Sequence, residues 1–232
     1  MCCLTIYKTK DDKLVVTHNR DEQWSRQADG AHVVEHEFNG KKIWMPKDNL
    51  SEGTWIGSDG KNTAAILNGF KENHIKKPNY RASRGTIIPQ FLSVGLDSFI
   101  KKFDPSGLEP FTLIMVDSND HILEYGWDET NIHIINYSSD NPLIYSSPTL
   151  YNSDICERRE NHFKNFIQEK IDHNDIWKFH ETKGDDHGNY INVKYNDEIS
   201  TVAISQIVTG DQSVFYYQSL INHNSKQSLI LL

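Results

Sequence analysis

Cysteine is scarce in this sequence, and its few positions leave little scope for disulfide bonds. Only three of the 232 residues are cysteine, at positions 2, 3 and 156. Adjacent cysteines cannot easily bridge to each other, and an odd number leaves at least one thiol free. A disulfide framework is therefore not expected, and a reducing compartment is the simpler interpretation. Cys156 is expected to pack in the core rather than react.

The sequence also lacks long apolar runs and an excess of positive charge. Its longest apolar stretches are far shorter than the ~20 residues that a membrane helix needs, and no basic region followed by an apolar run marks a secretion signal. The formal net charge of −8 argues against a protein that binds nucleic acid by neutralising phosphates. We expect a cytoplasmic protein without a membrane span or a nucleic-acid partner. The sequence does not indicate its oligomeric state.

The composition fits one globular domain. Apolar residues make up 37% of the chain and aromatic residues 11%, enough for one substantial core at this length. No repeat, linker or low-complexity segment interrupts the chain. Residues 1–232 are therefore predicted to form a single domain.

The β-prone segments are arranged as hairpins. Residues 3–8 and 13–18 flank a polar turn at 10–12, the pattern of an antiparallel pair. The same pattern recurs around turns at residues 39–40, 58–61, 117–120 and 209–212. Segments 132–137 and 143–146 are expected to continue the sheet.

Two blocks of helix are predicted between groups of strands. The first covers residues 85–94, where Ser83 is a candidate N-cap and Pro89 is expected to kink or shorten the helix, followed by a short helix capped by Asp97. In the second, apolar residues recur at helical spacing over 155–171. Helices that do not alternate with each strand disfavour a doubly wound parallel sheet. The predicted fold class is α+β, with antiparallel sheets covered by helices.

Cys2 and the segment Asn19-Arg20-Asp21-Glu22 fall at adjacent ends of the first hairpin. Removal of the initiator methionine would leave Cys2 with both a thiol and a free α-amine. The thiolate is the reactive form, and an α-amine with a pKa of about 7.7–8.0 can take the thiol proton. A buried Arg-Asp pair beside the thiol would lower its pKa through positive charge. The alternatives are an apolar start to a strand at Cys2 and a solvated turn at residues 20–22.

Several motifs occur in an order that resembles a known family. They are Met1-Cys2, Asn19-Arg20-Asp21-Glu22, Gly53-Thr54-Trp55-Ile56-Gly57, Leu67-Asn68-Gly69-Phe70, Ser83-Arg84-Gly85 and Ser200-Thr201-Val202. Together they resemble the NRDE family, also called transport and Golgi organisation protein 2. The resemblance implies an N-terminal-nucleophile (Ntn) hydrolase fold, a four-layer αββα sandwich. At the motif level the chain is also similar to the cysteine amidases of that superfamily, the penicillin V acylases and bile salt hydrolases.

The resemblance to the amidases implies roles for individual residues. Cys2 would be the nucleophile, Asp21 would hold its α-amine, and Arg20, which is adjacent to the amidases' arginine position, would help to orient it. Asn68 matches an asparagine on the oxyanion side, where a side-chain donor typically lowers the barrier by ~3 kcal/mol, although it could equally be a residue that ends a strand. The other residues expected to bind the ligand are Asn19, Glu22 and Ser146.

Two departures from the amidase pattern weaken the expectation of amide hydrolysis. Ser146 replaces the asparagine of an Asn-Ser-Pro-Thr motif, and Glu198-Ile199 precede Ser200 where related chains tend to carry arginine. The alternative function is a non-catalytic carrier or chaperone, because the resembled family is associated with haem handling and with lipid or acyl-CoA metabolism. No cofactor is required for the hydrolase. Haem is a possible ligand, with Cys2, Cys3 or His18 to ligate its iron.

Two further clusters are expected to be solvated loops. One spans residues 173–187, includes part of the polar stretch 180–188, and contains His173, His180, Asp185, Asp186 and His187, whose spacing matches no standard metal site. The other is the basic stretch 71–81, which could instead receive an anionic group. The expected ligand is thus a small amide, an acyl compound or a haem-like molecule.

Overall fold

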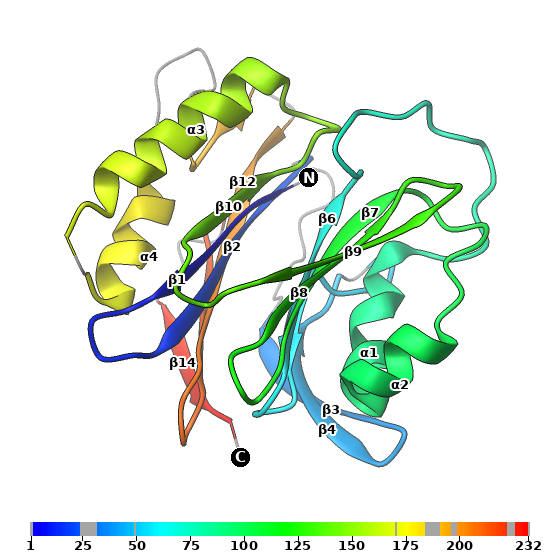
Figure 1. Ribbon diagram of the computed structural model, residues 1–232, viewed down its shortest axis with the longest axis horizontal. Coiled ribbons are helices and arrows are strands. Elements are labelled where there is room, and N and C mark those ends of the chain that lie inside the picture. Colours follow the sequence, from blue (N-terminus) through cyan, green and yellow to red (C-terminus); the bar gives the residue numbers. More distant parts are fainter. Residues whose placement is uncertain are drawn as a thin grey trace.

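Two antiparallel β-sheets lie face to face, and helices cover the outer side of each (Figure 1). A computed structural model describes residues 2–23, 32–48, 50–169, 171–183, 191–195, 199–221 and 226–231. The four-layer αββα sandwich with antiparallel sheets, expected from the resemblance to the Ntn hydrolases, is confirmed.

The first sheet contains both chain ends of the described region. Within that region its strands follow the order β10 (Leu143–Ser146), β1 (Cys2–Lys8), β2 (Leu14–Gln23), β12 (Ile199–Val208), β13 (Val214–Ser219) and β14 (Gln227–Ile230), and the short β11 (Lys194–Tyr195) pairs with β12. β1 and β2 form the predicted hairpin, and β2 continues through the Asn19-Arg20-Asp21-Glu22 segment.

The second sheet follows the chain order. Its strands are β3 (Val33–Phe38), β4 (Lys41–Pro46), β5 (Ile56–Ser58), β6 (Thr63–Asn68), β7 (Phe111–Val116), β8 (Ile122–Trp127) and β9 (Ile132–Tyr137). The turn between β3 and β4 has positive φ at both Asn39 and Gly40, as a type I′ turn requires. The prediction that residues 143–146 continue this sheet is wrong, because β10 pairs with β1 in the other sheet.

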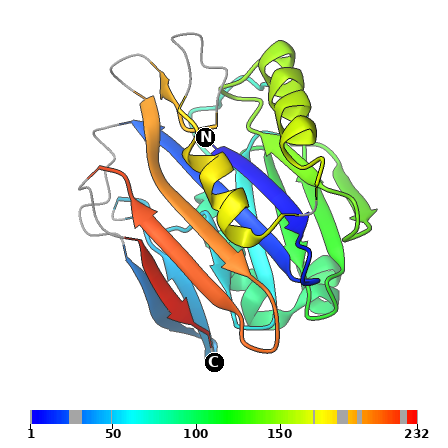
Figure 2. The same ribbon diagram turned by 90° about the vertical axis from the view of Figure 1, so that its left-hand side faces the viewer.

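The helices form the two outer layers. A short 3-10 helix, η2 (Arg84–Thr86), leads into α1 (Ile87–Val94) and α2 (Leu96–Lys102), and α1 packs on β4, β5 and β6. On the other side α3 (Ser153–Phe166) packs on β10, and α4 (His173–Glu181) lies across β2 and β12 (Figure 2).

Alternation along the strands sends successive side chains to different layers. Leu4 and Ile6 of β1 pack between the two sheets, whereas Cys3 and Tyr7 pack beneath α3 and α4. A third apolar cluster fills the space between the second sheet and α1 and α2. The residues at the start of β1 and the end of β2 thus face either the intersheet layer or the layer under α3 and α4.

Ser83 is an N-cap, as predicted, because it accepts a hydrogen bond from the backbone of Gly85 at the start of η2. The α-helix itself begins only at Ile87, so Pro89 lies in its first turn, where proline is tolerated. Two other expectations for the helical regions are wrong. Asp97 lies within the first turn of α2 instead of capping it. Position 180 belongs to α4, which the sequence pattern did not predict.

Among the described residues, no helix is long and apolar enough to cross a membrane.

Candidate active site

Cys2 and Arg20 face each other across the first hairpin. They are paired in the register of β1 and β2, so their side chains lie on the same face of the sheet, toward the second sheet. Cys2 is only 4% exposed, and its thiol borders a cavity of about 120 Å³. The lining residues include Arg20, Glu22, Asn68 and Arg84. The predicted proximity of Cys2 to the Asn19-Arg20-Asp21-Glu22 segment is therefore present in the structure.

Arg20 is held by a buried carboxylate and an aromatic ring. Its guanidinium forms an ion pair with Asp48 and lies 4.3 Å from the centroid of the Trp55 ring. The other oxygen of Asp48 accepts hydrogen bonds from the backbone of Leu50 and Ser51 at 2.9 and 2.8 Å. Asp48 thereby fixes both the loop on one wall of the cavity and the arginine opposite Cys2. Asp48 is not recognisable from the sequence, because nothing in its local pattern indicates this distant partner.

Asp21 projects to the layer under α3 and is surrounded by donors. Tyr151 Oη donates to Asp21 Oδ2 at 2.7 Å and Thr201 Oγ1 donates to Asp21 Oδ1 at 2.6 Å. Burial raises the pKa of the Asp21 carboxyl, and the nearby Arg159 guanidinium and the two hydroxyl donors oppose that rise. Arg159 is itself buried, 3.7 Å from the centroid of the Tyr151 ring. Asp21 therefore has a fixed orientation at the end of the sheet where β1 begins.

The thiol of Cys2 does not have the low pKa expected beside an arginine and an aspartate. Burial raises its pKa, Asp21 adds to the rise, and the positive charge of Arg20 opposes it. The expectation of a lowered pKa is wrong here because the desolvation of the thiolate outweighs the attraction to Arg20. Burial thus favours the neutral thiol at this position.

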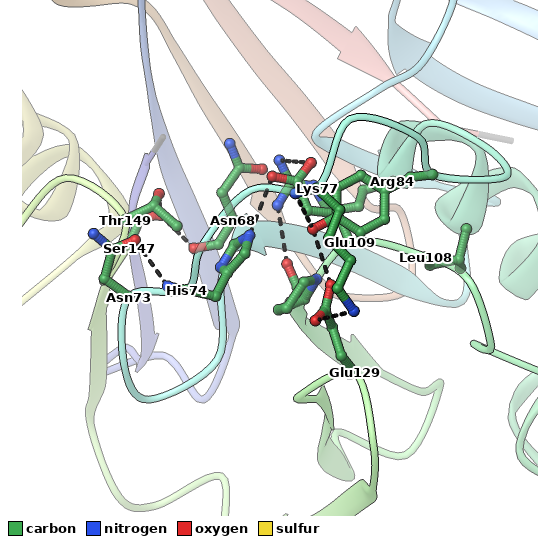
Figure 3. Close-up of polar contacts among 12 residues, drawn as sticks. Asn68, Asn73, His74, Lys77, Arg84, Leu108, Glu109, Glu129, Ser147 and Thr149 are labelled. Carbon is green, nitrogen blue, oxygen red and sulfur yellow. Dashed lines mark hydrogen bonds and ion pairs between the residues drawn. The ribbon is translucent and has the colours of Figure 1, made fainter.

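Asn68 ends β6 on the wall of the same cavity. Its backbone carbonyl accepts a hydrogen bond from Ser147 Oγ, and the backbone N–H of Ser147 donates to the carbonyl of Cys2 at 3.0 Å. Ser147 thus connects the start of β1 to the end of β6, one strand from each sheet. Figure 3 shows Asn68 with Ser147 and Thr149 beside it.

Two of the predicted binding residues lie away from this cavity. Asn19 faces α4, where its amide donates to the carbonyls of His180 and Ile191 at 3.0 and 2.9 Å. Ser146 lies on the same side of the sheet and accepts a hydrogen bond from Arg159 at 3.2 Å. Neither side chain lines the cavity around Cys2, because both are one residue out of phase with the strand positions that face it.

Arg84 is a cavity residue that the sequence analysis did not assign. It lies in η2, and its guanidinium forms an ion pair with Glu109 at 3.0 Å and donates to the Pro110 carbonyl at 2.9 Å. His74 lies 3.2 Å from the other oxygen of Glu109 (Figure 3). The Ser83-Arg84-Gly85 motif contributes to the family resemblance, but the sequence around Arg84 does not indicate its role. Its partners, Glu109 and Pro110, are distant in the sequence.

Basic side chains of the stretch 71–81 form ion pairs and hydrogen bonds with groups elsewhere in the protein. Lys77 forms an ion pair with Glu129 at 2.7 Å, and the guanidinium of Arg81 donates to the backbone carbonyl of Asp104. In the histidine and aspartate cluster, His180 is fully buried and bonded to Thr5 at 2.7 Å, so its assignment to a solvated loop is wrong. Asp185, Asp186 and His187 lie outside the described residues, as does Glu198 of the Glu198-Ile199 step.

The sequence matches the family model described as Transport and Golgi organisation 2 over residues 1–218. The chain belongs to this family. Membership of the Transport and Golgi organisation 2 family agrees with the predicted resemblance and covers nearly all of the described structure. No curated protein matches the sequence significantly.

Solved structures with the fold of this Transport and Golgi organisation 2 family member include two variants of the conjugated bile acid hydrolase from Clostridium perfringens. One has a TM-score of 0.63 at 10% identity, with 100% of this chain and 92% of that chain covered. The other has a TM-score of 0.60 at 8% identity, with 99% and 92% covered. Penicillin V acylase from Agrobacterium tumefaciens matches with a TM-score of 0.63 at 10% identity, covering 100% and 86%. At these identities the similarity establishes an Ntn-hydrolase fold.

Proposed function

We propose that this protein is a cysteine hydrolase of the Ntn type that cleaves a small linear amide or related acyl compound through an acyl-enzyme on Cys2. The observation that carries the proposal is the position of the Cys2 thiol. It lies on the wall of a small cavity, opposite Arg20 and beside Asn68, at the first residue of β1. The names of the similar structures, a bile acid hydrolase and an acylase, support the class of reaction.

Burial raises the pKa of the Cys2 thiol, and the mechanism therefore uses a base within the same residue. After removal of Met1, the α-amine of Cys2 takes the thiol proton, and the sulfur attacks the amide carbonyl carbon. The carbon–nitrogen bond then breaks, and the amine leaves with the proton that the α-amine returns. A water molecule next attacks the thioester carbon, which releases the acid and restores the thiol. Asp21 holds the ammonium form of the α-amine through its fixed carboxylate.

The oxyanion of each tetrahedral intermediate needs a donor on the cavity wall. Asn68 is positioned to supply one through its side-chain amide, since it lines the cavity with Cys2. Ser146 takes no part in this step, because it is bonded to Arg159 on the other side of the sheet. Arg20 keeps a positive charge opposite the thiolate, where Asp48 and Trp55 hold it in place.

Labelling with a cysteine-reactive acyl probe tests the proposal. We expect the purified protein to gain one acyl group by intact mass. Cys2→Ala should abolish the label while circular dichroism shows an unchanged fold. Cys156→Ser is the matched control, because that thiol is half-buried in a different cavity, and this variant should label like the wild type. Undiminished labelling of Cys2→Ala would contradict the proposal.

The alternative is a carrier or chaperone for haem or for an acyl-CoA or lipid ligand. It is favoured by a larger cavity of about 780 Å³ between β10, α3 and the loop after β6, whose apolar lining includes Leu67, Phe70 and Ile144. Cys2, Cys3 and His18 are all buried, so haem ligation by them would require a rearrangement of β1 and β2. Titration with haem and with acyl-CoA would reveal a carrier through the Soret band or tryptophan fluorescence, and no change at micromolar ligand would contradict it.

A further inference from the structure

Two arginines, Arg20 and Arg84, and two carboxylates, Asp48 and Glu22, line the Cys2 cavity. Arg20 and its partner Asp48 both line the cavity, so their charges compensate each other within it. Arg84 also lines the cavity, but its partner Glu109 does not. Glu22 is the remaining carboxylate on the wall, and it makes an additional interaction of its own. Arg84 thus lines the cavity while its ion-pair partner Glu109 lies outside the lining, and Glu22 is a second carboxylate whose charge reaches it.

Arg84 is held in this orientation by the backbone around it. Gly85 packs so closely on Gly53 that a Cβ on Gly85 would lie 2.7 Å from the Gly53 Cα, and the Gly85 carbonyl accepts a hydrogen bond from Thr54 at 3.0 Å. This contact fixes η2 against the segment that leads into β5. Glu109 and Pro110 then hold the guanidinium through an ion pair and a hydrogen bond, and Figure 3 shows Arg84 with Glu109.

The guanidinium retains hydrogen-bonding capacity after these contacts. It carries five N–H donors in a planar fork, of which the bonds to Glu109 and Pro110 use only part. Its side chain keeps an exposed fraction of 15%, and it borders the same cavity as the thiol. A planar fork of donors on a fixed backbone matches a carboxylate. A molecule that fills a cavity of about 120 Å³ and touches Cys2 also lies close to Arg84.

We propose that Arg84 binds a carboxylate of the ligand, so that the substrates are small amides or acyl compounds bearing an acid group near the reacting carbonyl. This inference rests on the proposed function for its substrate, but it makes a separate claim about which molecules reach the thiol. Arg84 acts here as a specificity residue that orients the anionic end of the compound.

The test compares two alkylating reagents of nearly equal size, iodoacetate and iodoacetamide. In both reactions the sulfur attacks the methylene carbon and iodide leaves, so the reagents differ mainly in the charge that enters the cavity. The measurement is the ratio of the two alkylation rates at Cys2, assigned by peptide mass spectrometry. We expect Arg84→Gln to lower the iodoacetate-to-iodoacetamide ratio about tenfold, since a charge-assisted hydrogen bond is lost.

Two further variants separate charge recognition from a structural effect. Glu109→Gln keeps an acceptor for Arg84 but removes the counter-charge, so the ratio should rise, opposite to Arg84→Gln. Arg81 lies in the segment before η2, outside this cavity, and Arg81→Gln should leave the ratio unchanged. The rates at Cys156 provide an internal reference in every variant. If circular dichroism shows that Arg84→Gln does not fold, the change of the iodoacetate-to-iodoacetamide ratio in Glu109→Gln decides whether Arg84 recognises the charge.

An unchanged ratio in folded Arg84→Gln, a ratio that does not rise in Glu109→Gln, or a Cys2 that neither reagent modifies would overturn the inference. These outcomes are distinguishable from failure of the proposed function, because alkylation requires only a thiol that small molecules reach. The ratio of the two alkylation rates can be measured even if the protein has no hydrolase activity. Conversely, suppose that Cys2 is acyl-labelled but that the iodoacetate-to-iodoacetamide ratio does not change in Arg84→Gln. That result would support the hydrolase and contradict the proposal that Arg84 binds a carboxylate of the substrate.

Discussion

At the scale of single residues, burial decides the ionisation of the groups around the site. Cys2, His18 and Asp21 are all buried on β1 and β2, and for each of them burial is the largest influence on the pKa and favours the neutral form. Burial of the Cys2 thiol thus outweighs the attraction of the Arg20 charge that faces it. The proposed mechanism instead relies on a base within the nucleophilic residue.

The effect of burial on the pKa can be measured at His18. Burial lowers its pKa to about 3, whereas the unfolded chain takes up a proton near pH 6.5. The free energy of unfolding should therefore fall as the pH drops from 6.5 toward 3, by about 1.4 kcal/mol per pH unit for this residue. His18→Leu removes that contribution, so its stability should decline less steeply with acid. Urea unfolding of both proteins from pH 7.5 to pH 4.5 tests this, and parallel curves would contradict it.

At the scale of elements, the segment between β4 and β5 positions the end of β2. The ion pair of Asp48 with Arg20 crosses from this segment to the strand, and both side chains are only 7% exposed. The Asp48 carboxylate also closes the loop through its bonds to Leu50 and Ser51. The orientation of Arg20 opposite Cys2 thus depends on a segment about thirty positions away in the chain.

Removal of the Asp48 charge should therefore be costly. Asp48→Asn keeps the loop hydrogen bonds but leaves Arg20 buried without its counter-charge, which should lower the free energy of unfolding by about 3 kcal/mol. The control is Glu35→Gln, which breaks the exposed pair with Lys42 and should cost less than about 1 kcal/mol. Urea unfolding measures both. Equal losses in the two variants would show that the buried pair has no special role.

The local sequence pattern correctly predicted the strands that pair with a strand close to them in the sequence. The pairing of Cys2 with Arg20 followed from the β1–β2 hairpin, and the strands around residues 58–61 and 117–120 form pairs as expected. The transfer of β10 to the other sheet was not predictable in this way, since it depends on packing between distant segments. For the same reason α4 was missed, because only nine residues form it and its burial comes from β2 and β12.

In the candidate site, too, some residues could be predicted from the sequence and others could not. Cys2, Arg20, Glu22 and Asn68 line one cavity as anticipated from strand ends and family motifs. Asn19 and Ser146 do not line this cavity, because membership of a motif does not say to which side of the sheet a residue points. Asp48 and Arg84 were overlooked, since a charged residue in a loop gives no local sign of the partner that buries it.

At the scale of the whole molecule, the sandwich brings the start of one sheet to the end of a strand in the other. Ser147 contacts the Cys2 backbone and the Asn68 backbone, and Trp55 donates to Ser205 across the same intersheet layer at 3.3 Å. The cavity at Cys2 is therefore lined from both sheets and from η2. This arrangement requires the two sheets to be packed before the site exists.

The central claim is that Cys2 acts as an N-terminal nucleophile. Peptide mass spectrometry of the acyl-labelled protein tests it most directly, because one fragment reports both the first residue of the chain and the labelled atom. The account predicts a fragment that begins at Cys2, lacks Met1 and carries the acyl group on the Cys2 sulfur. A labelled, active protein whose fragment still begins with Met1 would contradict it.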